Sequence, residues 1–210
     1  MRRIFLLYLF SSLFAASALA GETTVNSGQN TDLSKIQGIP QIEDFMFCEG
    51  MLKKGCDLFR AKSYEKAFAQ FNRWAERGEA GSMNNMAVML EAGLGVETDF
   101  DRARKLYLLA SEADVAIAQY NLGMFLGAKY MEAALASRKL TNAEQASRTE
   151  NLLNSYKWLR LAARQGHNKA MAGADELEPY MSEEEVKMAL HRIGWVLKNI
   201  KSKEDKYKVK

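Results

Sequence analysis

The sequence predicts an all-α fold in which antiparallel helix pairs stack into an α-solenoid. Three observations support this prediction. Apolar residues recur at helical spacing from about Gln41 to Ile200, no segment shows the two-residue alternation of a β-strand, and a pattern of small and large residues repeats at intervals of 36 residues. One helix pair leaves an apolar stripe exposed, whereas a stack of pairs buries it.

Composition and charge narrow the classes of function. Apolar residues make up 48% of the 210 residues and charged residues 26%, which excludes wholesale disorder, and two cysteines are too few for a disulfide-dense scaffold. The net charge of +3 comes from the two ends, since residues 1–20 hold two Arg and no acid and residues 198–210 hold six Lys against two acids. Residues 21–197 therefore carry a net charge of −3, and we predict no nucleic-acid partner.

The first twenty residues have the layout of a cleavable secretory signal. The start Met1-Arg2-Arg3 is cationic, an apolar stretch follows, and Ala18-Leu19-Ala20 supplies the small residues of a cleavage site after Ala20. An uncleaved N-terminal anchor is the alternative, because the apolar stretch continues to Leu19. We expect a flexible polar leader over residues 21–40, no transmembrane segment in the mature chain, and a periplasmic or secreted location.

Eight helices are expected after the leader. Thr141-x-x-Glu144 and Ser182-x-x-Glu185 have the spacing of capping boxes, in which two side chains satisfy free amides of the first turn. Ser63 and Thr98 are expected to cap helices through their hydroxyls. The expected helices span residues 49–61, 64–77, 80–92, 100–113, 116–139, 142–165, 168–177 and 183–200, before a Lys-rich, solvated tail over 201–210.

Internal repetition organises the helical domain over residues 41–200. Ser82-x-x-x-Met86-Ala87-x-x-Leu90 aligns with Ala118-x-x-x-Leu122-Gly123-x-x-Leu126, and the small residues in each allow neighbouring helices to approach closely. Trp158-Leu159-x-x-Ala162-Ala163-x-x-Gly166 is a third copy of the second-helix pattern, displaced by an insertion of 16 residues. The expected units are about 49–78, 79–114, 115–166 with an inserted longer hairpin at 127–154, and C-terminal capping helices over 167–200.

The repeat resembles a known family. Gly93-Leu94-Gly95-Val96-x-x-Asp99-x-x-x-Ala103, together with the second-helix pattern ending at Gly166, is similar to the Sel-one-like repeat, a relative of the tetratricopeptide repeat. The resemblance covers about 49–177 and includes a short opening repeat typical of exported bacterial members. It departs from the family pattern in the inserted hairpin and at Asp114, where the family has glycine.

The resemblance implies a right-handed superhelix that scaffolds protein–protein contacts, often in export or envelope pathways. In tetratricopeptide-type folds the first helix of each pair lines the concave face, so a protein or peptide partner is expected there. Core packing is the alternative role for Tyr120 and Met124, and the inserted hairpin is a second candidate contact surface. The residues expected on the concave face are Asn84, Val88, Glu91, Ile117, Tyr120 and Met124.

Residues that could carry chemistry are few. His167 follows a turn glycine and His191 has no partner at metal-ligand spacing, so we predict no metal site and no cofactor. Ser63-x-x-Lys66 matches one motif of penicillin-recognising enzymes, but its companion motifs are missing, and a capping role for Ser63 is the simpler interpretation. No catalytic residue is therefore predicted.

The two cysteines have two open alternatives. Cys48 and Cys56 have the spacing of the disulfide pairs in cysteine-rich relatives, and an oxidising compartment favours a bond. On one continuous helix, however, their Cα atoms would be ~12 Å apart, too far for a disulfide. A bond therefore requires the chain to break at Glu49-Gly50, and two free thiols are the alternative.

The sequence thus predicts an exported scaffold for protein–protein contacts in the cell envelope, within a secretion, motility or envelope-maintenance complex. It is not expected to be an enzyme. The alternative is a penicillin-binding or weakly β-lactam-hydrolysing protein, as implied by the cysteine-rich secreted members of the family.

Overall fold

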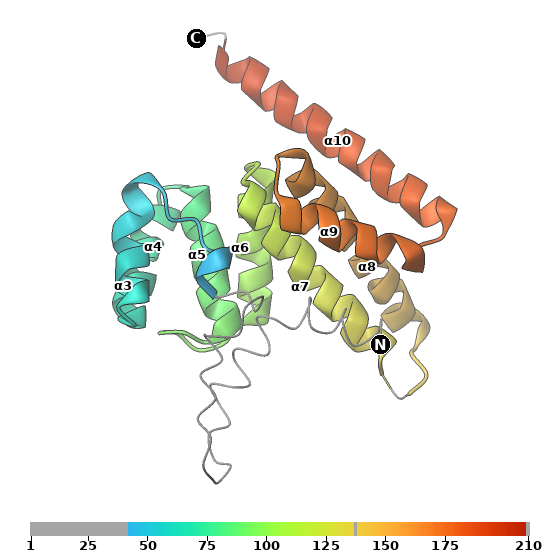
Figure 1. Ribbon diagram of the computed structural model, residues 1–210, viewed down its shortest axis with the longest axis horizontal. Helices are drawn as coiled ribbons and strands as arrows, with labels where there is room; N and C mark the ends of the chain where they lie inside the picture. Colours follow the sequence, from blue (N-terminus) through green and yellow to red (C-terminus); the bar gives the residue numbers. More distant parts are fainter. Residues whose placement is uncertain (1–41, 137, 209–210) are drawn as a thin grey trace.

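In the computed structural model, which describes residues 42–136 and 138–208, the helices pack in chain order as a stack of antiparallel layers (Figure 1). The predicted signal (residues 1–20) and leader (21–40) lie outside the described residues. The all-α solenoid is confirmed, since the described part of the chain contains helices and no strand. The helices are α3 (Lys53–Arg60), α4 (Tyr64–Ala75), α5 (Ala80–Ala92), α6 (Phe100–Glu112), α7 (Ala116–Ala134), α8 (Asn142–Arg164), α9 (Asn168–Leu177) and α10 (Glu183–Lys208), with short 3-10 helices η2 (Ile42–Phe45), η3 (Gly50–Leu52) and η4 (Glu178–Tyr180).

Three helices have a bound more than two residues away from the predicted one. The first helix, expected from residue 49, begins at Lys53, because Gly50–Leu52 form the 3-10 helix η3. Helix α7 stops at Ala134 instead of residue 139, because the chain needs the following residues to reverse direction before the capping box of Thr141 starts α8. Helix α10 continues to Lys208 instead of ending at Ile200, since no Gly or Pro interrupts its Lys-rich end. In Figure 1, α10 crosses α8 and extends beyond the rest of the stack.

Two of the predicted caps are wrong. Asp99, rather than Thr98, caps α6, because its carboxylate accepts a hydrogen bond from the amide of Arg102 at 2.9 Å. Ser63 precedes α4, but its side chain makes no capping hydrogen bond. The capping box at Thr141 forms as predicted, and Ser182 and Glu185 bond each other in the same reciprocal way.

The glycine turn between α5 and α6, the two helices of one repeat unit, contacts the preceding unit. Gly93 ends α5 in the left-handed conformation, with a φ of +66°. Gly95, with a φ of +68°, lies against the start of α4, where an added Cβ would be 2.4 Å from the Glu65 amide nitrogen and from the Tyr64 carbonyl carbon. The left-handed backbone favours glycine at both positions, and the contact with the preceding unit adds a second reason at Gly95.

Each unit also ends in a left-handed residue. Gly78 and Gly166 have φ values of +83° and +88°, and Asp114 has the same conformation at +61°. Asp is one of the few non-glycine residues that adopts this region without a large penalty. Its carboxylate accepts hydrogen bonds from the side-chain amides of Gln119 at 2.8 Å and Gln165 at 2.9 Å, which fixes the turn where the family pattern has glycine.

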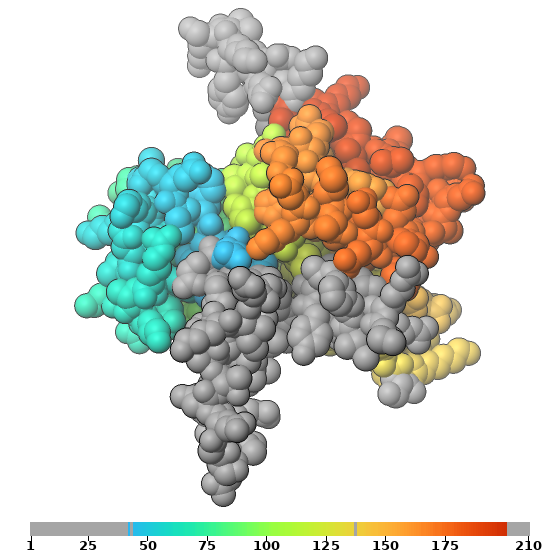
Figure 2. Space-filling model, viewed as in Figure 1, coloured from blue at the N-terminus to red at the C-terminus, as the bar shows by residue number. Residues whose placement is uncertain are grey.

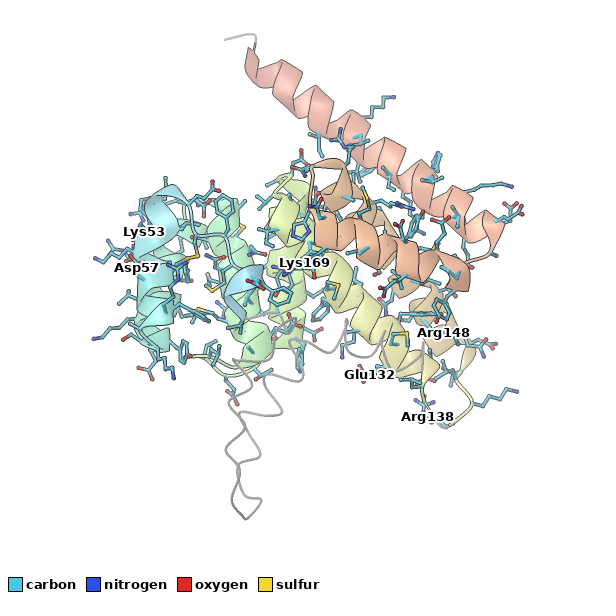
Figure 3. All side chains as sticks on the ribbon, viewed as in Figure 1. Lys53, Asp57, Glu132, Arg138, Arg148 and Lys169 are labelled. Carbon is cyan, nitrogen blue, oxygen red and sulfur yellow. A yellow bond between two sulfur atoms is a disulfide. The ribbon has the colours of Figure 1, made fainter. Side chains whose placement is uncertain are left out.

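The inserted hairpin lengthens the α7–α8 layer. Near its base the two helices touch closely, since a Cβ on Gly123 would lie 2.7 Å from the Cγ of buried Leu159. Glu132, Arg138 and Arg148 lie toward its far end (Figure 3). The guanidinium of Arg148 stacks over the Tyr130 ring at 5.3 Å and thereby links the two helices. None of the described helices is both long and apolar enough to cross a membrane.

The geometry of the glycine turn predicts unequal effects of two matched substitutions. Gly78→Ala adds only the cost of a left-handed alanine, about 1–2 kcal/mol, because nothing lies within 4 Å of the new Cβ. Gly95→Ala adds the same cost and also pushes α4 away, so we expect its free energy of unfolding to fall by more than about 3 kcal/mol. Urea denaturation of both variants measures the difference, and equal losses would contradict the proposed backbone contact.

Candidate functional site

The concave face of the stack is occupied by the chain itself. Residues 42–48, called the N-terminal segment from here on, cross the first helix of every layer, from α9 through α7 and α5 to α3. The segment contains the η2 turn and then non-helical backbone. Figure 1 shows η2 beside α5, and Figure 2 shows the same residues between the cyan surface of α3 and α4 and the orange surface of α9.

Three asparagines of α5 and α7 hold the backbone of this segment. The side-chain amides of Asn84 and Asn121 both donate to the Phe45 carbonyl, at 2.9 Å and 2.7 Å, and Asn121 also donates to the Asn84 side-chain oxygen at 2.8 Å. Asn85 donates to the Phe47 carbonyl and accepts from the Phe47 amide, both at 2.7 Å. Because these bonds go to main-chain atoms, the site can hold a peptide backbone whatever its side chains.

Aromatic stacking anchors the middle of the segment. The Phe45 ring, 2% exposed, stacks on Tyr120 with 6.0 Å between centroids and 9° between planes. Tyr120 stacks in turn on His167 of the turn before α9, at 4.3 Å. Burial raises the pKa of Tyr120 to about 12 and lowers that of His167, so both rings are neutral at pH 7. The arrangement forms an apolar aromatic pocket for one phenyl ring.

Further contacts hold the two ends of the segment. Asp44 pairs with Lys169 of α9 at 3.1 Å across the groove, and Figure 3 shows Lys169 at the end of α9 nearest the segment. The Phe47 ring lies over Gly81 of α5, where an added Cβ would be 2.4 Å from the ring.

Cys48 and Cys56 form a disulfide that attaches the segment to α3. Their Cα atoms are 5.8 Å apart, whereas eight steps along a helix would separate them by ~12 Å. The difference arises because Cys48 precedes the helices and the chain turns at Gly50, whose φ is +55°. The free-thiol alternative is therefore not what the structure has, since neither cysteine is free.

The residues predicted to line an open concave face are mostly buried. Asn84 and Tyr120 do point into the groove, but the N-terminal segment covers them. Ile117 is partly buried against the core. The three others are buried in the core; they are Val88, Glu91 and Met124.

Four groove residues were missed by the sequence reasoning. Asn85 and Asn121 are 36 residues apart and thus occupy the same position of two repeats, a signal that the internal alignment contains. His167 and Lys169 carry no comparable signal, because only the path of the N-terminal segment brings them to the groove.

Glu91 is a buried acid rather than a partner-binding residue. Its carboxylate accepts a hydrogen bond from the Tyr107 hydroxyl at 2.9 Å. Burial raises the pKa of Glu91 to about 7, although the Tyr107 hydrogen bond and the charge of Lys129 favour the ionised form. Glu91 therefore titrates near neutral pH inside the stack.

The motifs considered for chemistry do not assemble into a catalytic site. Ser63 is partly buried and Lys66 is exposed, and no hydrogen bond among the described residues joins their side chains. His191 lies exposed on α10, while the Nδ1 of His167 caps α9 by accepting from the Ala170 amide at 3.2 Å. The described residues contain no group of three or more His, Cys, Asp or Glu that could hold a metal ion.

The buried acid predicts a pH dependence of stability. The unfolded chain ionises Glu91 near pH 4.5, but the folded chain does so only near pH 7, so stability falls as pH rises between these values and levels off above them. We expect Glu91→Gln to reduce the stability lost between pH 5 and pH 8 by about 2–3 kcal/mol. Urea denaturation at several pH values measures this slope.

A matched variant tests the sign of the effect. Tyr107→Phe removes a hydrogen bond that favours the ionised carboxylate, so its stability should fall more steeply with pH than that of the wild type. An unchanged slope in Glu91→Gln would contradict the assignment.

Comparison with known proteins identifies the repeats. The family model of the Sel1 repeat matches residues 80–115, 116–133 and 147–167, which correspond to α5 with α6, most of α7, and the later part of α8. The unmatched residues between the last two matches are the end of the inserted hairpin. No curated protein and no solved structure matches the chain. The chain therefore contains three Sel1 repeats, a repeat related to the tetratricopeptide repeat.

Proposed function

We propose that this protein is an exported scaffold that binds a protein partner in the cell envelope, within a secretion, motility or envelope-maintenance complex. Sel1 repeats generally mediate protein–protein contacts, and proteins built from them are generally non-enzymatic scaffolds. The proposal adds the compartment and the kind of complex to this family property.

One observation carries the binding role. Asn84, Asn85 and Asn121, from two successive layers, hold main-chain atoms of a segment that crosses the concave face. A surface that recognises backbone atoms is suited to binding a segment of another protein, because backbone groups are common to all sequences. The stack presents these amides from rigid helices, which lowers the entropic cost of binding.

Two features support export. The cationic start, apolar stretch and Ala18-Leu19-Ala20 site have the order of a secretory signal. The Cys48–Cys56 disulfide is of a kind that persists in oxidising compartments and is rare in the cytosol.

The export proposal predicts a processed N-terminus. When the full chain is expressed in a bacterium, we expect mass spectrometry of the osmotic-shock fraction to find a protein that begins at Gly21. A variant with Arg2→Glu and Arg3→Glu should remain unprocessed, because the signal loses its cationic start. Recovery of the wild-type chain with an intact Met1 in the membrane fraction would instead support an uncleaved anchor.

The scaffold proposal predicts capture of a partner that depends on the fold. We expect the purified chain, used as bait with an envelope fraction of its own organism, to retain one protein in stoichiometric amount. The experiment is run at a temperature at which Gly95→Ala is unfolded and Gly78→Ala is folded. The Gly78→Ala bait should then retain the partner, and the Gly95→Ala bait should not. Repeated recovery of no partner, or equal capture by the unfolded bait, would contradict the proposal.

A further inference from the structure

We propose that the concave groove is a binding site for a short acidic–aromatic peptide of the form Asp-Phe-x-Phe, and that residues 44–47 of this chain occupy the site in cis. The inference rests on the proposed function, because it names the class of segment that the scaffold binds. It is based on the contacts of the N-terminal segment, which resemble the contacts of a bound peptide more than the helix–helix packing of a repeat.

The backbone contacts define the register of the bound peptide. The carbonyl of the first Phe receives two hydrogen bonds, from Asn84 and Asn121, and the second Phe exchanges two with Asn85. All four bonds come from side chains of α5 and α7. Any peptide whose backbone carbonyl and amide groups are free at these two positions can form these four hydrogen bonds.

The side-chain contacts define the sequence preference. The first Phe stacks on Tyr120, whose ring also stacks on His167, and the second Phe lies on the flat surface that Gly81 leaves on α5. The acidic residue before the first Phe meets Lys169. The residue between the two Phe is Met46, which is buried but makes no side-chain hydrogen bond, so this position requires an apolar residue of no particular kind.

The way in which the N-terminal segment is connected to the stack allows another peptide to replace it. It lies outside the matched repeats, and its links to the stack are the exposed turn at Glu49–Met51 and the disulfide. Such a short tether gives a high effective concentration, so the segment excludes a weaker peptide while it is attached. Its departure would expose the aromatic pocket, which a peptide of the same chemistry would cover.

A cleavable version of the chain tests the site directly. A protease recognition sequence inserted between Glu49 and Gly50 lies in an exposed turn with open space around it. Cleavage there leaves the N-terminal segment held by the Cys48–Cys56 disulfide. Reduction with dithiothreitol then yields two thiols and the cyclic disulfide of the reagent, and it leaves the segment held only by its noncovalent contacts, so that gel filtration can separate it from the stack.

The binding measurement uses a fluorescent, acetylated and amidated peptide of residues Ile42–Phe47. We expect fluorescence anisotropy to show saturable binding to the cleaved and reduced protein, and at least ten-fold weaker binding to the uncleaved protein in the same reductant. Phe45→Ala in the peptide should weaken binding at least ten-fold, because it removes the buried anchor. Asp44→Asn should weaken it only about two- to five-fold, because its ion pair is half exposed.

Two results would overturn the inference. One is failure of the cleaved and reduced protein to bind the peptide although circular dichroism shows an intact helical fold. The other is equal binding of a scrambled peptide of the same composition. If release of the segment unfolds the stack, the uncleaved Phe45→Ala variant provides the test instead. Its emptied pocket should bind the peptide at least ten-fold more tightly than the wild-type protein does. Equal binding by the two proteins overturns the inference.

The peptide also separates this inference from the proposed function. A captured envelope protein that an excess of the peptide displaces supports both. A captured protein that the peptide does not displace supports the scaffold and counts against the groove as its binding site. Peptide binding without any captured partner supports the groove and counts against the envelope role.

Discussion

Each helix pair in this protein leaves an apolar face that only the next pair covers, and covering it requires the helices to approach closely. At Gly123 the backbone of α7 comes so near to α8 that a methyl group would collide with Leu159. At Gly95 the turn of one unit touches the α4 backbone of the unit before it. The Gly123 contact sets the spacing of the two helices within one layer, and the Gly95 contact sets the spacing between two layers.

The stack also leaves a concave face, which no further repeat covers. The chain covers part of it with its own N-terminal segment, and side-chain amides of α5 and α7 donate hydrogen bonds to carbonyls of that segment. The side-chain oxygen of Asn121 is buried there without a hydrogen-bond partner. Asn84, Asn85 and Asn121 would each lose hydrogen bonds if the segment left and water did not replace it. The same amides that stabilise the folded chain therefore form a site with a defined backbone register.

Buried polar residues elsewhere in the stack have a different role, because they bond to each other and not to the N-terminal segment. Glu91 and Tyr107 satisfy each other between α5 and α6, away from the groove, and the burial that pairs them also moves the pKa of Glu91 close to neutral pH. This pair couples the stability of the central layers to pH without contacting the N-terminal segment. The pH dependence of stability and the hydrogen bonds of the groove thus depend on separate groups.

The sequence by itself determined the helices, their order and the repeat family, because helical periodicity, capping boxes and the Gly93–Gly95 turn are local patterns. It also contained the repeat-related pair Asn85 and Asn121. Only the tertiary structure decided the occupancy of the groove, the Cys48–Cys56 bond and the burial of Glu91. Each of these depends on the path of a non-helical segment or on the rotation of a helix about its own axis. Local spacing along the chain specifies neither.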